Sequence, residues 1–229
     1  MKPSVATTAM LMAAGCAWGQ VTPETPGWFP FDMPGLAAPP GSPADLSAMN
    51  TEPAGAAGFV RIADGRFVDA AGRRLRLYGT NLTGDSCFPE SEQADALARR
   101  LRQYGFNVVR LHFMDYNRPG SIWADADAGT LDDAQLARLD RLIAACAANG
   151  IYTNINLHVA RSYPGQPEVR GTQLFTMGKS LDRWYEPYVA MQEAYARPLL
   201  GRVNHVPGRR YAEDPALACV QLKHENTLM

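Results

Sequence analysis

Polar side chains capable of acid-base chemistry stand at the ends of three apolar segments. His112 ends the segment NVVRLH, His158 ends IYTNINLH, and His224 and Glu225 follow ALACVQLK. Partial burial of a carboxylate at the mouth of an apolar strand raises its pKa and suits it to general acid catalysis. Glu225 is therefore the leading candidate for an acid, the alternative being a solvated glutamate at the start of a loop. We expect the three histidines to share a polar pocket with it.

Arg110 lies inside the apolar run of residues 108–111. Burial of a guanidinium is unfavourable unless a carboxylate or several hydrogen-bond acceptors contact it. We therefore expect Arg110 near an acid, either in a structural ion pair or in a catalytic role. A metal site made of His112, His158 and Glu225 is a less favoured alternative, because no HxH or HExxH pair places two ligands on one element.

Alternating strand and helix patterns separate these residues. A β-hairpin is predicted around Asp64-Gly65, and four strands are predicted at residues 75–82, 106–113, 151–158 and 216–223. The helices between them are expected to begin near Ser91, Thr130 and Leu181, with buried faces that include Leu136, Leu139, Ile143 and Cys146. This alternation predicts a parallel sheet whose strands are buried on both faces and whose ligands bind outside their carboxyl ends.

The overall composition favours a small molecule or a neutral polymer as partner. The 229 residues include 22 basic and 23 acidic side chains, and 46% of the residues are hydrophobic. This balance gives no electrostatic basis for binding nucleic acid or anionic lipid. Of the four cysteines, Cys16 lies in the amino-terminal signal region, and the other three are widely spaced and form no disulfide framework. Cys146 and Cys219 are expected in the core and Cys87 at the surface.

Residues 1–19 have the three-part pattern of a secretory signal peptide, with cleavage predicted before Gln20. A competing interpretation is a lipoprotein site at Cys16, which would tether the protein to a membrane by lipid. The sequence therefore predicts a secreted or periplasmic protein. Residues 20–58 are rich in proline and glycine and are expected to form an irregular lead-in, followed by one domain over residues 59–229.

Four segments in order carry a resemblance to a known family. LRLYGTNL, NVVRLHF, a strand ending in Asn-Leu-His, and DPALACVQLKHENTL are similar to the strands of clan A glycoside hydrolases, within it the cellulase-like enzymes of family five. The resemblance covers residues 59–229. It implies a (β/α)8 TIM barrel, of which this chain would hold the first four strands, a half-barrel preceded by the hairpin. It also implies retaining hydrolysis of β-glycosidic bonds by two glutamates, with no cofactor.

The resemblance also implies roles for individual residues. Glu225 matches the general acid/base, and Arg110 matches an arginine that supports the nucleophilic glutamate. His158 matches a histidine of the sugar-binding cleft, and His112 and Asn226 are further substrate-binding candidates. His224 stands where the family has an asparagine that bonds the sugar 2-hydroxyl, and an imidazole can donate one such bond.

The function implied is hydrolysis of a β-linked polysaccharide or oligosaccharide by a secreted enzyme. The family's nucleophilic glutamate follows a seventh strand, so we expect these 229 residues to be an inactive amino-terminal fragment. The aromatic side chains Tyr163, Phe175, Trp184 and Tyr185 are candidates for stacking on sugar rings. Two alternatives remain: a non-catalytic carbohydrate-binding protein on a degenerate barrel, and a metal-dependent hydrolase that uses the strand-end histidines.

Overall fold

A computed structural model describes residues 41–161 and 181–225 of the chain. The predicted signal peptide, Cys16, most of the lead-in, Tyr163, Phe175 and Asn226 lie outside these residues. Within the described ranges, no helix combines the length and the hydrophobicity needed to cross a membrane.

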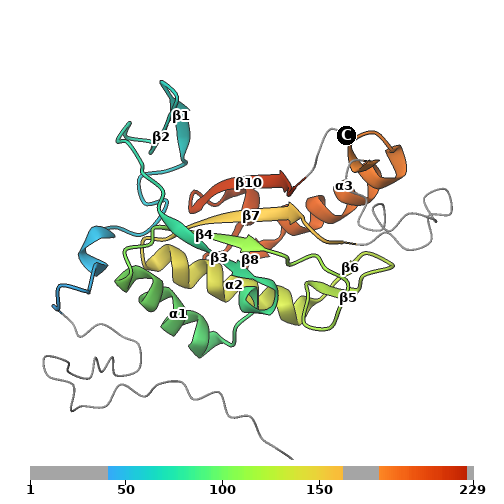
Figure 1. Cartoon of the computed structure of the whole chain (residues 1–229), viewed down its shortest axis with the longest axis horizontal. Coiled ribbons are helices and arrows are strands. Elements are labelled where there is room, and N and C mark those ends of the chain that lie inside the picture. The colour runs from blue at the N-terminus through green and yellow to red at the C-terminus, as the bar shows by residue number, and fades with distance from the viewer. Residues whose placement is uncertain (1–40, 162–180, 226–229) are drawn as a thin grey trace, which may run out of the picture. The chain divides into compact units, whose positions relative to one another are not determined.

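Four parallel strands form the central sheet (Figure 1). They are β3 (Gly79–Thr83), β4 (Val108–His112), β7 (Tyr152–His158) and β10 (Leu217–Lys223). Their spatial order, β10-β7-β4-β3, is the order of the sequence, so each strand pairs with the next one along the chain. The predicted α/β fold with a parallel sheet is therefore confirmed. Because all four strands are parallel, their carboxyl ends lie at the same edge of the sheet.

Three helices connect these strands: α1 (Ser91–Gln103), α2 (Asp133–Ala148) and α3 (Glu186–Gly201). Figure 1 shows α1 and α2 along one side of the sheet. One hydrophobic core joins that side to the strands. It includes Val109, Leu111 and Ile155 from the sheet, Ala98 from α1, Leu139 from α2 and Leu199 from α3. The predicted buried face of α2 is confirmed, since Leu136, Leu139, Ile143 and Cys146 are all buried.

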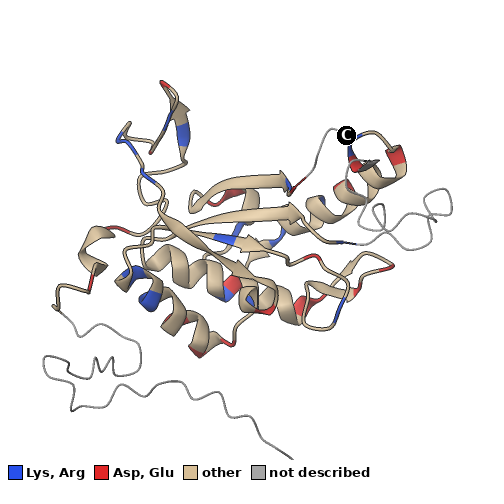
Figure 2. Cartoon of the chain, viewed as in Figure 1, with Lys and Arg blue, Asp and Glu red and all other residues tan. Residues whose placement is uncertain are grey.

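The opposite face of the sheet is not covered in the same way. On that face Cys219 of β10, Asn154 of β7 and Arg110 of β4 are only partly buried, and Asn81 of β3 is exposed. The expectation that every strand is buried on both faces is therefore wrong for the described residues, because the described helices pack on one face only. Figure 2 shows charged residues mainly on helices and loops, whereas the strands of the sheet are almost uncharged.

Several short elements complete the described chain. The hairpin β1 (Arg61–Ala63) and β2 (Arg66–Val68) turns at Asp64 and Gly65, whose φ angles of 49° and 68° suit a type I′ turn. Two further hairpins pair β5 (Trp123–Asp125) with β6 (Thr130–Leu131) and β8 (Val203–Asn204) with β9 (Arg209–Arg210). Short 3-10 helices occupy Ser47–Met49, Gly84–Cys87, Leu181–Arg183 and Tyr211–Glu213.

Two predicted boundaries are wrong for reasons visible in the hydrogen bonds. The first strand of the sheet begins at Gly79 rather than Leu75, because the Leu75 N–H bonds to the Phe67 carbonyl of the hairpin. Helix α2 is capped by Asp132, whose carboxylate accepts the N–H groups of Ala134 and Gln135 at 2.8 and 3.2 Å. Thr130, predicted to cap this helix, lies in β6 instead.

Cys87 is fully buried, so the expectation of an exposed thiol is wrong. The 3-10 helix after β3 folds it beneath the sheet edge, where its Sγ donates to the Leu82 carbonyl at 3.2 Å. Burial raises the pKa of this thiol to about 12. Cys87 is therefore a core residue with no thiolate chemistry at neutral pH.

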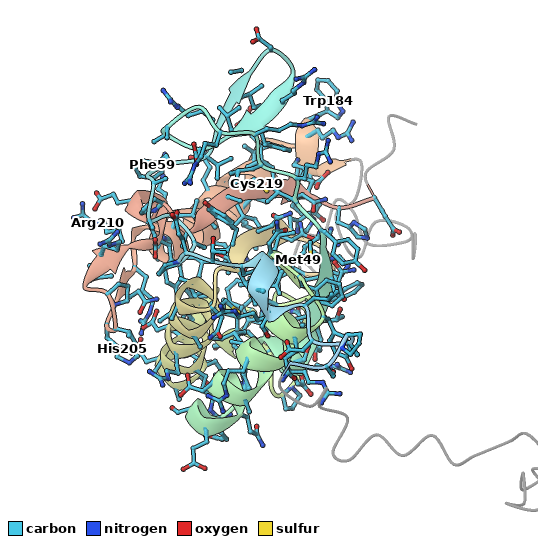
Figure 3. All side chains as sticks on the ribbon, turned by 90° about the vertical axis from the view of Figure 1, so that its left-hand side faces the viewer. Met49, Phe59, Trp184, His205, Arg210 and Cys219 are labelled. Carbon is cyan, nitrogen blue, oxygen red and sulfur yellow. The ribbon has the colours of Figure 1, made fainter. Side chains whose placement is uncertain are left out.

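Residues 41–58, the described part of the lead-in, bond to the ends of two helices. The Leu46 N–H donates to the Gln103 carbonyl at the end of α1, and the Ala54 N–H donates to the Ala147 carbonyl near the end of α2. Carbonyls at helix carboxyl ends have no partner within the helix, so these contacts satisfy them. Figure 3 shows Met49 of this segment close to the helices. The segment is a packed extension of the domain.

Candidate active site

The sheet face that lies away from the helices is lined by polar side chains. Asn81 of β3, Arg110 of β4 and Asn154 of β7 are in register across it, beside Cys219 of β10. A hollow of about 510 Å³ on this face is bounded by Phe67, Leu77, Gly79, Thr80, Asn81, Val108, Arg110, Asn154 and Cys219. The strand period of two thus separates an apolar core face from a polar, accessible face.

Arg110 is the centre of a hydrogen-bond network at this face. Its Nε donates to Gln221 Oε1 at 2.7 Å, and its Nη2 donates to Asn156 Oδ1 at 2.8 Å and to His224 Nδ1 at 3.1 Å. These partners are neutral acceptors, so a dense set of acceptors rather than a salt bridge satisfies the guanidinium. Burial lowers the pKa of Arg110, and the charge of Glu225 acts in the opposite direction. The predicted ion pair between Arg110 and an acid is not among the salt bridges of the described residues, and the charge of Glu225 acts on Arg110 only at longer range.

His112 joins the same network. Its Nδ1 lies 2.7 Å from Asn156 Oδ1, and its ring packs edge-on against the ring of His224 with centroids 4.5 Å apart. Burial lowers the pKa of His112, the Asn156 hydrogen bond raises it, and the charge of Arg110 lowers it further. A neutral imidazole at physiological pH follows, since the ordinary value is already below neutrality.

His224 and Glu225 turn the chain at the end of β10. The His224 N–H bonds to the His158 carbonyl at 2.9 Å and extends the β10–β7 pairing. Glu225 then has a φ of 51°, a left-handed conformation uncommon for a residue with a side chain and often associated with functional sites. Its side chain is 71% exposed, with Oε1 3.4 Å from His224 Nε2. In the described chain the expected partial burial of this carboxylate is therefore wrong, because no described element covers the turn after β10.

The ion pairs of His158 are with other groups than the contacts of His112 and His224, so the contacts of the described residues do not bring all three imidazoles into one network. His158 is 3% exposed, with Nδ1 3.6 Å from Asp115 Oδ2 and Nε2 3.4 Å from Asp182 Oδ2. Both carboxylates are fully buried, which strengthens their attraction for the imidazole. Asp115 also accepts the backbone N–H groups of Val159, Ala160 and Arg161, and so fixes the chain after β7.

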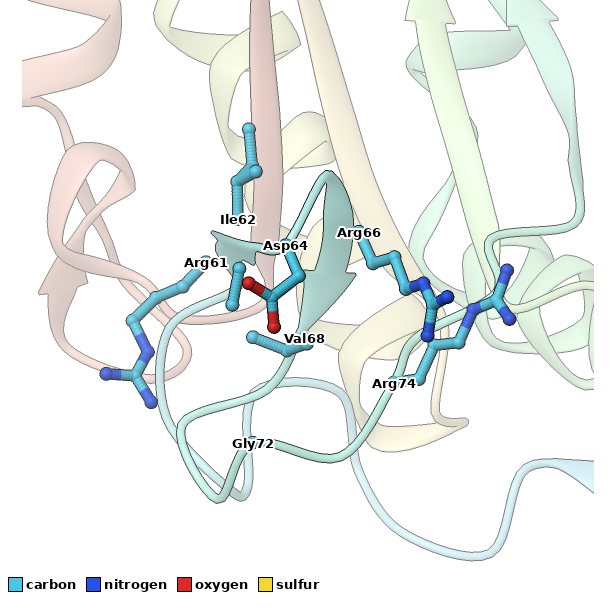
Figure 4. Close-up of a pocket in the computed structure, with 8 residues that line it drawn as sticks. Arg61, Ile62, Asp64, Arg66, Val68, Gly72 and Arg74 are labelled. Carbon is cyan, nitrogen blue, oxygen red and sulfur yellow. The ribbon is translucent and has the colours of Figure 1, made fainter.

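Other places in the structure are less suited to this chemistry. A hollow of about 340 Å³ beside the hairpin is lined by Arg61, Arg66 and Arg74 with only Asp64 as an acid (Figure 4).

Two further expectations concern sugar stacking and metal binding. Trp184, labelled in Figure 3, is 75% exposed, as a sugar-stacking residue requires. In the described part of the chain, no three histidine, cysteine, aspartate or glutamate side chains are grouped so that they could hold a metal ion.

The family model for cellulase (glycosyl hydrolase family 5) matches residues 68–195, more than half of the chain. This chain belongs to glycosyl hydrolase family 5. Arg110, His112 and His158 lie inside the matched range, whereas His224 and Glu225 follow it. The predicted resemblance is confirmed at the level of the family.

Solved structures with the same fold come from this family and from mannan-degrading enzymes. The endo-1,4-beta-mannanase from Rhizomucor miehei has a TM-score of 0.57 at 19% identity, over 73% of this chain and 48% of that one. A glycoside hydrolase family 5 mannosidase from the same organism has a TM-score of 0.57 at 17% identity, over 74% and 49%. A mutant of that mannosidase was solved with mannosyl-fructose, with a TM-score of 0.57 at 17% identity, over 73% and 49%.

The family 5 chain spans about half the length of these solved structures. Identities below one fifth show a common fold and leave substrate choice open. No curated protein matches the sequence.

Sequence reasoning missed four side chains that contact the candidate residues: Asn156 and Gln221 at Arg110, and Asp115 and Asp182 at His158. A signal for the first existed in the strand Tyr152–His158, where Asn154, Asn156 and His158 alternate with apolar residues and so share one face. No local pattern marks Asp115 or Asp182, because both lie in connections whose partners are distant in sequence.

Proposed function

We propose that this chain is the amino-terminal half of the catalytic domain of a secreted, retaining glycoside hydrolase that cleaves a β-linked polysaccharide or oligosaccharide. The single observation that carries the proposal is the position of Glu225. It follows β10 at the carboxyl edge of the parallel sheet, with an accessible carboxyl group beside His224 and near Arg110. Membership of glycosyl hydrolase family 5 supports the reaction class.

The described sheet would form four of the eight strands of a (β/α)8 barrel. Strands that pair in sequence order, with helices packed on one face, are wound as in a barrel and not as in a doubly wound sheet, whose helices cover both faces. The polar face with Asn81, Arg110 and Asn154 would then face the barrel interior. The strand carboxyl ends would lie at the face where barrel enzymes bind their substrates.

In this reaction Glu225 would act twice. Its protonated carboxyl group would donate a proton to the glycosidic oxygen as a second carboxylate attacks the anomeric carbon. The resulting Glu225 carboxylate would then accept a proton from the water that hydrolyses the glycosyl-enzyme intermediate. His112, His224 and Asn226 remain the substrate-binding candidates at this edge, and His158 is a candidate only if substrate reaches its buried position.

Retaining hydrolysis requires a second carboxylate, the nucleophile, besides Glu225. Among the described residues, Glu225 is the only glutamate within two residues of the carboxyl end of a strand of the sheet. A retaining mechanism needs two carboxyl groups on opposite sides of the bond. We therefore propose that these 229 residues alone do not hydrolyse glycosides and that activity belongs to the complete enzyme.

The decisive experiment compares two substitutions in the complete enzyme. Glu225→Gln removes the acid with little change of shape, and Glu213→Gln alters an exposed glutamate that contacts Arg210 before β10. Initial rates would be measured on β-mannan, β-glucan and aryl β-glycosides. Loss of a general acid/base lowers kcat/KM by about 10²- to 10⁴-fold, and the control should retain its rate. Equal rates for the two variants exclude Glu225 from the mechanism.

The same preparations separate the proposal from a non-catalytic binding role. A complete protein that binds a β-glycan but releases no product, with or without Glu225→Gln, would be a carbohydrate-binding protein. Export is tested separately, by amino-terminal sequencing of the protein from medium and periplasm. Cleavage by signal peptidase predicts a mature protein beginning at Gln20, whereas lipid on Cys16 would identify the lipoprotein alternative.

A further inference from the structure

His224 lies between the two charged groups of the candidate site. Its Nδ1 is 3.1 Å from Arg110 Nη2, and its Nε2 is 3.4 Å from Glu225 Oε1. The side chain is 22% exposed, and its ring meets the ring of His112 at an interplanar angle of 85°. The imidazole therefore presents a different nitrogen to each charged group.

The contact with Arg110 determines which nitrogen carries the proton. A guanidinium has five N–H donors and no acceptor, so a nitrogen that it contacts must be an acceptor. Nδ1 of His224 is therefore unprotonated, and a neutral ring then carries its proton on Nε2. This N–H is the group that faces the Glu225 carboxyl group.

Through Asn156, the same arginine also determines which ring nitrogen of the neighbouring His112 carries the proton, and this is the other nitrogen. Arg110 Nη2 donates to Asn156 Oδ1 at 2.8 Å, which requires that this atom is the amide oxygen. The oxygen can only accept, so His112, whose Nδ1 lies 2.7 Å away, carries its proton on Nδ1. One guanidinium thus holds two adjacent histidines as opposite tautomers.

We propose that His224 is a positioning residue for Glu225, held by Arg110 as the Nε2–H tautomer so that it donates to the Glu225 carboxylate. The inference rests on the proposed role of Glu225 as acid/base, and His224 acts through that carboxylate. A donor on the ionised carboxylate stabilises the form that Glu225 must take as a base. Arg110 and His112 of β4 and Glu225 itself are the titratable groups that face the ring, and β7 contributes the His158 carbonyl.

The tautomer is measurable in the 229-residue chain without any sugar. Long-range ¹H–¹⁵N correlation spectra of the imidazoles distinguish protonated from unprotonated ring nitrogens. At neutral pH we expect His224 protonated on Nε2 and His112 on Nδ1. His224 protonated on Nδ1, or on both nitrogens, overturns the proposal.

A matched pair of arginine variants tests the cause of the tautomer. Arg110→Met removes the donor and should leave His224 as a mixture of tautomers, whereas Arg66→Met removes an exposed arginine of the hairpin and should change neither ring. If Arg110→Met does not fold, Arg110→Lys keeps a cation that can only donate and should preserve the Nε2–H form. A fixed Nε2–H tautomer in folded Arg110→Met also overturns the proposal.

The effect on Glu225 is tested with two substitutions of His224. His224→Phe keeps a ring beside His112 but has no donor, and His224→Asn keeps an N–H donor. Following the Glu225 side-chain carboxyl by ¹³C NMR at neutral pH, we expect its resonance to move in His224→Phe, because the carboxylate loses a hydrogen-bond donor. His224→Asn should restore most of the difference, and an unchanged resonance in His224→Phe overturns the positioning role.

These measurements do not depend on catalysis. If the complete protein hydrolyses no β-glycoside while the His224 tautomer and the Glu225 carboxyl resonance behave as expected, the proposed function is wrong and the contact between His224 and Glu225 is confirmed. If hydrolysis depends on Glu225 while His224→Phe changes nothing, the function stands and the positioning role is wrong.

Discussion

Two polar clusters in this chain are built from similar residues and differ in charge balance. On the helix side of the sheet, the fully buried Asp140 accepts hydrogen bonds from Arg202, His205 and Tyr211. At the polar face, Arg110 donates to the neutral side chains of Gln221, Asn156 and His224. The first cluster pairs its charge within the chain, and the second holds a cation without a carboxylate at hydrogen-bond distance among the described residues.

This difference in charge balance indicates that the Asp140 cluster stabilises the fold, whereas the Arg110 network can attract an anionic group. Burial by itself would raise the pKa of Asp140, but hydrogen bonds from Arg202, Tyr211 and His205 outweigh it, and the pKa lies below the ordinary value. Folding thus favours the ionised form of Asp140, and this form in turn stabilises the folded state. Arg110 instead has its pKa lowered by burial, and the charge of Glu225 counteracts this. A guanidinium in that environment favours an anionic neighbour, as a site for charged intermediates requires.

The largest expected effect is on the Asp140 cluster. Asp140→Asn leaves Arg202 without its buried partner and should lower the free energy of unfolding by about 3 to 5 kcal/mol, as measured by urea denaturation. Asp133→Asn is the matched control, since Asp133 lies in the same helix, is 98% exposed and is 3.7 Å from Arg202. That variant should stay within about 0.5 kcal/mol of the unaltered chain. Similar losses for both variants would show that the buried pairing is unimportant.

A smaller loss is expected when one donor is removed from the same carboxylate. Tyr211→Phe deletes the hydroxyl that donates to Asp140 Oδ1 at 2.5 Å and keeps the ring packing. Hydrogen bonds to charged groups contribute about 1.5 to 3 kcal/mol, so unfolding should require less urea by a corresponding amount. An unchanged midpoint would mean that Arg202 and His205 alone satisfy the carboxylate.

Acid should weaken the Asp140 cluster in a defined pH window. A carboxyl group with a lowered folded pKa stabilises the protein above its ordinary value of 3.8 and loses that contribution as the pH falls through the folded value. The stability difference between the unaltered chain and Asp140→Asn should therefore be constant at neutral pH and shrink below about pH 4. Urea titrations across this range check the sign, and a difference that grows in acid would contradict it.

The smallest expected effect on stability comes from the hydrogen-bond network of Arg110. Arg110→Met removes a partly buried charge whose partners are neutral. Gln221 and His224 are partly exposed and can bond to water, and the buried Asn156 keeps its contact with His112. We expect a change of about 1 kcal/mol or less in the chain, well below that of Asp140→Asn. A loss as large as that of Asp140→Asn would make Arg110 a structural residue and remove the contrast between the two clusters.

Local patterns predicted much of the fold and some of the candidate site. The alternation of apolar runs and amphipathic helices predicted the parallel sheet, and the strand-end positions of His112, His224 and Glu225 predicted a shared edge. The start of β3 was predicted four residues too early because local alternation continues through Leu75 and Leu77, while the backbone there bonds to the hairpin. Strand propensity alone does not predict whether a segment pairs with the hairpin or with the central sheet.

The sequence by itself determined the element order and the placement of Glu225 after β10, whereas it did not predict the polar face of the sheet. Only the tertiary structure decided which side chains meet. Arg110 and Gln221 are 111 positions apart, and Asp115 and Asp182 reach His158 from two different connections. The physical reason is that periodicity fixes the direction of a side chain relative to its own element, whereas contact depends on register and on competition for buried charges across elements.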